Sequence, residues 1–204
     1  MSPHRFGRRV LTTLRLFERG GYALGPLAWT RTDGGSWQAM PLGSSGRPRL
    51  VTMISAAQED ELRAFCNLVA RRLPAGGELT WALDRFEMGC ERLAPFEALT
   101  DYLLALRALL EPEGPASGRL AGRLAVICAK PQDRAALTER MAHAISLERA
   151  VIAGIAPGEP GLDALVEELA DHLRAMLRDV LCGHLDPDLR TIADQLLAQA
   201  ATPA

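Results

Sequence analysis

A histidine and two arginines near the end of a long predicted helix could carry acid–base chemistry. His143 is a candidate proton donor or acceptor because an imidazole titrates near neutral pH. Arg140 and Arg149 lie close to it in the sequence and could act with it by stabilising negative charge. The simpler interpretation is a partly exposed helix histidine without a catalytic role. The same two interpretations apply to His172 and His184, and the sequence leaves both open.

Other common catalytic and binding motifs are missing from the sequence. Glu167, Glu168 and Asp171 form an acidic cluster opposite a leucine stripe, without the clustered histidines of a metal site. The segment Gly118–Gly122 lacks the lysine and the preceding strand of a phosphate-binding loop. No GxSxG motif and no Cys/His nucleophile pattern stands out. We therefore predict neither a metal nor a cofactor.

Composition and charge predict a compact cytoplasmic protein. The chain has 204 residues, of which 48% are hydrophobic, enough for a full core. A net charge of −2 gives no global positive field for nucleic acid or an anionic membrane. No apolar run approaches the roughly 20 residues of a membrane span, and no cleavable leader is recognised. The widely spaced cysteines are expected to be reduced thiols: Cys66, Cys90, Cys128 and Cys182.

The spacing of apolar residues predicts a helical bundle over residues 55–204, built as one compact unit. Ser55 and Gln58 fit a capping box, which marks the start of the first helix. Later helices are predicted wherever apolar residues recur every three or four positions. These helices cover 79–90, 99–110, 119–129, 131–154 and 162–181, and a last helix begins at the cap Asp186.

The first 54 residues have a different pattern and are predicted to form an appendage. Apolar residues over 10–17 indicate a helix, and a β-hairpin follows around the turn Asp33–Ser36. Trp29 and Trp37 flank this turn. We expect them to pair across it rather than to form a platform for stacking bases.

Three blocks of sequence occur in an order and spacing that resemble the Apea-like group of HEPN proteins. They are VLTTLRLFERGGYALGP at 10–26, LDRFEMGCERLAPFEALTDYLLALRALLEPEG at 83–114, and RLAGRLAVICAKPQDRAALTERMAHAISLERAVIAG at 119–154, followed by LVEELADHLRAMLRDVL as the usual closing helix. The resemblance covers most of the chain. It implies a bundle of antiparallel helices and, in active members, metal-independent RNA cleavage. A histidine would then act as general acid or base and an arginine would stabilise the phosphorane-like transition state, at a site shared across a dimer.

This chain departs from the family pattern at both catalytic positions. The family arginine falls on Glu148 and the family histidine on Ala153, while Gly154 remains. Alanine cannot transfer a proton, and a carboxylate would repel a phosphate. Shifting the alignment by one residue places Arg149 at the arginine position but leaves glycine in place of histidine. The motif is incomplete in either register.

A second departure lies in the middle helix, and here too the charge is the reverse of the one in the family pattern. The glutamate of the family's ALEALL segment falls on Arg107 in LLALRALL. The family pattern thus has an acid at the position of Arg107 and a base at the position of Glu148, whereas this chain has a base and an acid there. If the two helices are neighbours, Arg107 and Glu148 can form a structural ion pair of reversed polarity.

We therefore predict a catalytically inactive HEPN-like binding or regulatory protein, in a bacterial defence or stress system. A homodimer follows from the resemblance, and the leucine stripes over 99–110 and 162–181 would offer extra apolar surface for it or for a protein partner. One alternative is an active metal-independent ribonuclease with a relocated site at His143 and Arg149. Another is a purely structural helical interaction domain.

Surface charge would discriminate between these functions. A concave patch that joins Arg123, Arg140 and Arg149 would favour RNA as a partner, whereas a neutral or acidic surface would favour protein.

Overall fold

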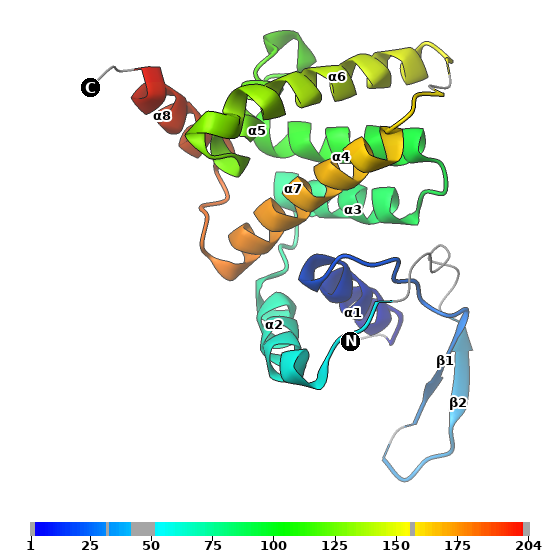
Figure 1. The fold of residues 1–204 in the computed structure, drawn as a ribbon. Coiled ribbons are helices and arrows are strands. Elements are labelled where there is room, and N and C mark those ends of the chain that lie inside the picture. Colours follow the sequence, from blue (N-terminus) through cyan, green and yellow to red (C-terminus); the bar gives the residue numbers. More distant parts are fainter. Residues whose placement is uncertain (1–2, 32, 42–51, 156–157, 202–204) are drawn as a thin grey trace. The chain divides into compact units, whose positions relative to one another are not determined.

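The computed structural model describes residues 3–31, 33–41, 52–155 and 158–201. Within these residues the chain forms eight α-helices and one two-stranded antiparallel hairpin (Figure 1). The predicted class, mainly helical with a small hairpin near the N-terminus, is confirmed. The elements group into two compact units, residues 1–73 and 74–204, which we name the N-terminal and C-terminal units. The helix that follows Ser55 groups with the N-terminal unit, although the predicted boundary after residue 54 leaves it with the bundle.

The N-terminal unit has a core built from two amphipathic helices. Its elements are α1 (Pro3–Phe17), β1 (Leu27–Thr30), β2 (Gln38–Pro41), a 3-10 turn (Ala56–Gln58) and α2 (Glu59–Arg72). The helices pack against each other, with the rings of Phe17 and Phe65 5.9 Å apart. The Ser55 N–H donates to Gln58 Oε1 at 3.0 Å, which completes the predicted capping box before α2. Local sequence signals therefore define where the second helix begins.

The hairpin does not pair its two tryptophans. Trp29 lies opposite Ala39 in the register of the strands. Trp37 is two residues before Ala39, so the two indoles are diagonal neighbours rather than facing ones. Arg31 lies over the Trp37 ring instead, 5.6 Å from its centroid. No ring contact joins the two tryptophans in the described part of the chain, and the predicted pairing is wrong.

The C-terminal unit is organised around one apolar helix. Its elements are α3 (Glu78–Glu91), α4 (Pro95–Leu110), α5 (Leu120–Cys128), α6 (Arg134–Ile152), α7 (Leu162–Cys182) and α8 (Leu189–Ala201), with 3-10 turns at Pro115–Ser117 and Pro131–Asp133. Helix α4 contacts the other five helices. Helix α7 runs obliquely across α4 and α3 (Figure 1). Because α4 has neighbours on several sides, most of its leucines are buried.

Helices α3 and α4 approach each other closely at a glycine. A Cβ atom on Gly89 would lie 2.3 Å from Cε1 of Tyr102, so no larger residue fits without movement. Asp101 of α4 is almost fully buried and accepts hydrogen bonds from Arg92 Nε at 2.7 Å and Arg85 Nη1 at 3.2 Å. Arg92 follows α3 and Arg85 lies within it, so Asp101 connects the two helices by charge as well as by packing.

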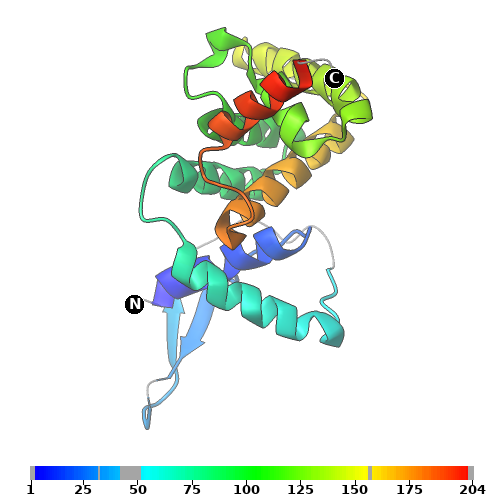
Figure 2. The same cartoon turned by 90° about the vertical axis from the view of Figure 1, so that its left-hand side faces the viewer.

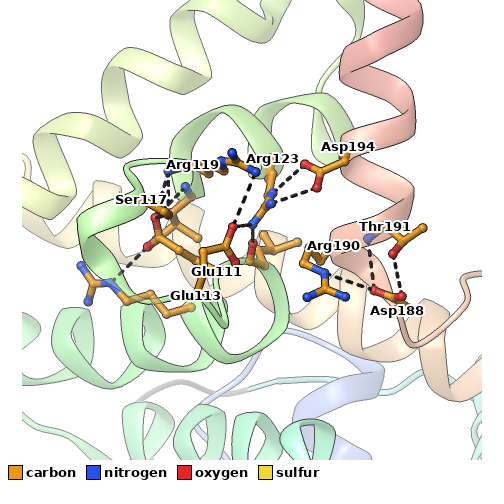
Figure 3. Close-up of polar contacts among 12 residues, drawn as sticks. Glu111, Glu113, Ser117, Arg119, Arg123, Asp188, Arg190, Thr191 and Asp194 are labelled. Atoms are coloured by element: carbon orange, nitrogen blue, oxygen red, sulfur yellow. Dashed lines mark hydrogen bonds and ion pairs between the residues drawn. The ribbon is translucent and has the colours of Figure 1, made fainter.

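The last helix begins two residues later than predicted. Asp188 is its cap, because Asp188 Oδ1 accepts from the Thr191 N–H at 3.1 Å and Oδ2 accepts from the Thr191 hydroxyl at 2.7 Å (Figure 3). These bonds hold the pKa of Asp188 below its usual range. Asp186 accepts from the Asp188 N–H at 2.8 Å and shapes the turn before the helix. The prediction of Asp186 as the cap is wrong because the threonine three residues after Asp188 completes the better cap.

Candidate functional site

The structure brings Arg107 of α4 and Glu148 of α6 together as a bidentate ion pair. Arg107 Nη1 donates to Glu148 Oε1 at 2.7 Å, and Nη2 donates to Oε2 at 2.6 Å. The glutamate side chain is 3% exposed and the arginine side chain 14%. Two parallel charge-assisted hydrogen bonds fix the relative orientation of both groups. The pair inferred from reversed polarity is thus a buried link between two helices.

Each charge of this pair depends on the other. Arg107 lies near the end of an apolar helix, and Glu148 lies among buried residues of α6. Removing an isolated charge from water costs several kcal/mol, which only close, well-oriented partners can offset. The hydrogen bonds that Arg107 donates to Glu148 raise the pKa of the Arg107 guanidinium, although burial acts in the opposite direction. The guanidinium is therefore held charged, and Glu148 is not free to serve as a base.

A third charged group, Glu111, lies beside the pair and caps the next helix. Its Oε1 accepts from the Ser117 hydroxyl at 2.6 Å and from the N–H groups of Arg119 and Leu120 at 2.9 and 3.3 Å (Figure 3). Its Oε2 lies 3.7 Å from Arg107 Nε. A carboxylate at the N-terminus of α5 satisfies amides that have no partner within the helix. Glu111 therefore has a structural role, and within the described residues no histidine is hydrogen-bonded to Ser117.

Two hollows of the C-terminal unit are lined in part by these charged residues. One has a volume of about 370 Å³ and is lined on its apolar side by residues such as Ile145 and Ile152. The other has a volume of about 550 Å³ and includes Trp81 in its wall. Arg107 and Glu111 line both hollows. Neither set of lining residues contains a histidine, so neither hollow offers an ordinary group for proton transfer near pH 7.

Ala153, where the resemblance would place a histidine, and Gly154 form the end of helix α6. Ala153 is the C-cap, and Gly154 follows with a φ of +82°. The Gly154 N–H donates to Val151 O, and the Ile155 N–H donates to Ala150 O, both at 2.9 Å. These two bonds are those of a Schellman motif, which favours glycine in the left-handed conformation. Gly154 thus has a reason to be glycine that requires no catalysis.

His143 and Arg149 do not converge on one site. They are six residues apart on the same helix, which separates their directions by roughly 120° around the helix axis. His143 Nε2 lies 2.9 Å from Glu159 Oε1 at an exposed position. Arg149 lines the smaller hollow, and within the described residues its guanidinium has no charged partner. The geometry of this fallback pair does not form an acid–base site within one copy of the chain.

The remaining candidate groups lie close to carboxylates of α7. Arg140 makes three hydrogen bonds of 2.8 to 3.0 Å to Glu168. His172 Nε2 lies 3.7 Å from the same carboxylate, and His184 Nδ1 lies 3.5 Å from Asp179. No group of three or more histidine, cysteine or acidic side chains that could hold a metal ion occurs among the residues that the structure describes.

Arg123 is a second buried charge. Its side chain is 1% exposed, so it cannot join Arg140 and Arg149 in a surface patch. Its Nε and Nη2 donate to the Asp194 carboxylate at 2.8 and 2.9 Å, and Nη1 donates to Leu110 O at 2.7 Å (Figure 3). Nη1 also lies 2.6 Å from Glu113 Oε1. Arg123 therefore connects α5 to α8 and to the end of α4.

A sequence signal for this second link exists. Arg123 lies in LAGRLAVIC, an apolar helix in which no acidic residue is three or four positions away. A charge in such surroundings must find a partner from another element. Arg107 also lies in an apolar helix, but Glu111 is four positions away from it, and only the resemblance supplied its distant partner. Asp194 and Glu113 could not be chosen in the same way, because neither stands out among the chain's 25 acidic residues.

Comparison with known proteins identifies no relative of this chain. No family model, no curated protein and no solved structure matches the chain. In the described ranges, no helix combines the length and apolar character needed to cross a membrane.

Proposed function

We propose that the chain is a catalytically inactive HEPN-like protein that acts by binding, as a homodimer or as a regulatory partner in a bacterial defence or stress system. The observation that carries the proposal is the buried Arg107–Glu148 pair. Its acidic member stands where the resemblance expects the catalytic arginine. Both oxygens of that carboxylate are engaged by one guanidinium, so the position retains helix packing without the chemistry of cleavage.

The surroundings of the pair support the same function. Ala153, at the family histidine position, closes α6 and supplies no proton-transfer group. The nearest hollow is lined by two buried carboxylates, Glu111 and Glu148, and by Arg107 and Arg149, so its lining carries no net positive charge to attract a phosphate. The relocated ribonuclease is less well supported, because His143 does not line that hollow and is next to Glu159 instead.

Support for a dimer comes from a surface other than the predicted one. The leucine stripes over 99–110 and 162–181 are buried within the C-terminal unit and offer no surface to a second copy. Exposed apolar side chains occur instead at the end of α6, where Ile152 is 74% exposed and Ile155 61%. These two isoleucines are three positions apart, and exposed apolar residues near one another are a feature of protein interfaces. We place the dimer contact at this end of α6.

Incubation of the purified protein with a mixed pool of labelled RNAs in EDTA tests the lack of catalysis. No cleavage is expected from the well-folded protein. The His143→Ala variant is the matched control, because a relocated site would need that imidazole. Cleavage by the unmodified protein that disappears in the variant would overturn the proposal in favour of an active ribonuclease.

Light scattering of Ile152→Glu tests the dimer contact. A charge at the centre of an apolar interface should convert the dimer to a monomer without unfolding it, because Ile152 is exposed within one copy. Leu93→Glu is the matched control, since Leu93 is 66% exposed and lies between α3 and α4. A monomeric unmodified protein, or equal dissociation by both variants, would contradict this interface.

A further inference from the structure

The two units carry opposite charges. Residues 1–73 contain 11 arginines and 5 acidic residues, a formal net charge of +6. Residues 74–204 contain 12 basic and 20 acidic residues, a net charge of −8. The overall charge of −2 therefore conceals a basic unit. Such a unit attracts polyanions, whereas the C-terminal unit repels them.

The hairpin of the basic unit exposes one face of its strands. Leu27 and Trp29 are 57% and 64% exposed, and Trp37 just before β2 is 61% exposed. Side chains of the opposite face, such as Ala28 and Met40, are half-buried. Figure 2 shows both strands extending beyond α1 and α2 of the same unit. Two indoles that the unit does not bury form an apolar surface suited to a partner.

We propose that the N-terminal unit binds single-stranded nucleic acid, with the indoles of Trp29 and Trp37 stacked on bases and arginines in contact with phosphates. Stacking on an indole requires only the π face of a base. Arg31 lies over the Trp37 ring and brings a positive charge to the stacking position. Arg8 and Arg19 are further exposed cations of this unit. The unit thus combines stacking platforms on its hairpin with charges of the sign that a polynucleotide backbone requires.

A lipid surface is the main alternative for a basic unit with exposed indoles. The end of the hairpin argues against it, because Asp33 and Gly34 form the turn and would enter the lipid first. The tryptophans lie on a strand face instead, which is the arrangement that sheet-based RNA-binding modules use to stack successive bases. This inference concerns the N-terminal unit and does not depend on the function proposed for the C-terminal one.

Fluorescence anisotropy of a labelled oligothymidylate of about 15 nucleotides, titrated with the full-length protein at about 50 mM salt, tests the proposal. Trp29→Ala and Trp37→Ala should each weaken binding by about tenfold, because each removes one stacking platform. Trp81→Ala is the matched control, since Trp81 is a partly exposed tryptophan of the acidic unit, and binding should not change. Affinity should also fall as salt rises.

A second readout ties the effect to the indoles themselves. Bases stacked on Trp29 and Trp37 should quench the protein's emission, and the quenching should disappear in the double variant, where Trp81 alone remains. The absence of saturable binding by folded protein would overturn the proposal. So would equal affinity of the two hairpin variants and the unmodified chain, or binding of a duplex as tight as that of the single strand. Binding to anionic vesicles without binding to the oligonucleotide would assign the surface to lipid.

Discussion

Two multidentate arginine–glutamate pairs involve helix α6, and they differ mainly in their access to water. Arg107 and Glu148 have side chains that are 14% and 3% exposed, whereas Arg140 and Glu168 are 46% and 31% exposed. In both pairs, hydrogen bonds to the glutamate raise the pKa of the arginine. Similar geometry therefore occurs in two dielectric environments. Water can replace the partner in the exposed pair but not in the buried one, so only the buried pair is expected to be indispensable.

The largest effect is expected from Arg107→Glu. This change leaves Glu148 without its partner and adds a carboxylate close to Glu111, which lies 3.7 Å from the present guanidinium. The free energy of unfolding should fall by about 3–5 kcal/mol or more. Urea denaturation followed by far-ultraviolet circular dichroism measures this loss. Arg140→Glu is the matched control, and similar losses in the two variants would show that burial does not distinguish the pairs.

Exchanging the charges of Arg107 and Glu148 tests whether the two residues stabilise the fold as a pair. In the Arg107→Glu, Glu148→Arg double variant, the attractive pair is restored with the opposite polarity. Recovery should be incomplete, because Glu111 stays next to position 107 and repels the new carboxylate. A coupling energy of about 2 kcal/mol or more between the two changes is expected from a double-mutant cycle. Additive losses would mean that Arg107 and Glu148 stabilise the fold independently.

The Arg123–Asp194 pair lies between these two cases. Arg123 is fully buried, whereas Asp194 is 45% exposed. Asp194→Asn should cost about 1–2 kcal/mol, because solvent screens the carboxylate while Arg123 keeps its bonds to Leu110 O and Glu113. Urea denaturation at neutral pH measures this loss, and Asp188→Asn is a control for an acid outside the buried network. If Asp194→Asn lowered the free energy of unfolding as much as Arg107→Glu, the Arg123–Asp194 pair would not be intermediate between the buried and the exposed pair.

The Arg123–Asp194 pair should also make the free energy of unfolding depend on pH, with a loss of stability at low pH. Hydrogen bonds from Arg123 hold the pKa of Asp194 below its ordinary range. The ionised form therefore stabilises the fold at all pH values above the unfolded pKa of about 3.9. This contribution is lost as pH falls through the lower pKa of the folded state. The difference in unfolding free energy between the unmodified protein and the Asp194→Asn variant should shrink below about pH 4.

Local signals predicted the elements better than the long-range partners. Helix periodicity and the Ser55–Gln58 capping box located α2 because both depend on residues that are neighbours in sequence. The buried link of Arg107 followed from a resemblance that pointed to Glu148. No resemblance pointed to a partner for Arg123, and 71 residues separate it from Asp194. Nothing in one sequence identifies which distant acid meets which buried base.

Overall composition and net charge also did not predict which surfaces of the protein are exposed or charged. The leucines of α4 and α7 suggested an apolar interface, yet six helices packed in one unit bury them. The overall charge suggested no affinity for polyanions, although 20 of the 25 acidic residues lie in the C-terminal unit and leave the N-terminal unit with a net positive charge. Trp29 and Trp37 flank a turn, but the strand register decides that they lie diagonally and not face to face. Each of these depends on which elements become neighbours, and composition does not contain that information.

The smallest effect is expected at the exposed pair, and salt separates it from the buried one. Arg140→Ala should lower the free energy of unfolding by about 1 kcal/mol or less, because water solvates Glu168 when its partner is lost. Raising the ionic strength to about 1 M shortens the screening length to roughly 3 Å, so the difference from the unmodified protein should then disappear. Arg107→Ala should keep most of its larger loss at the same salt, since Glu148 remains buried without a partner. Denaturation of both variants at low and high salt, each against the unmodified protein, makes the measurement. If salt removed the loss of Arg107→Ala to the same extent, ions would have access to that pair, and its role as a buried link between α4 and α6 would be contradicted.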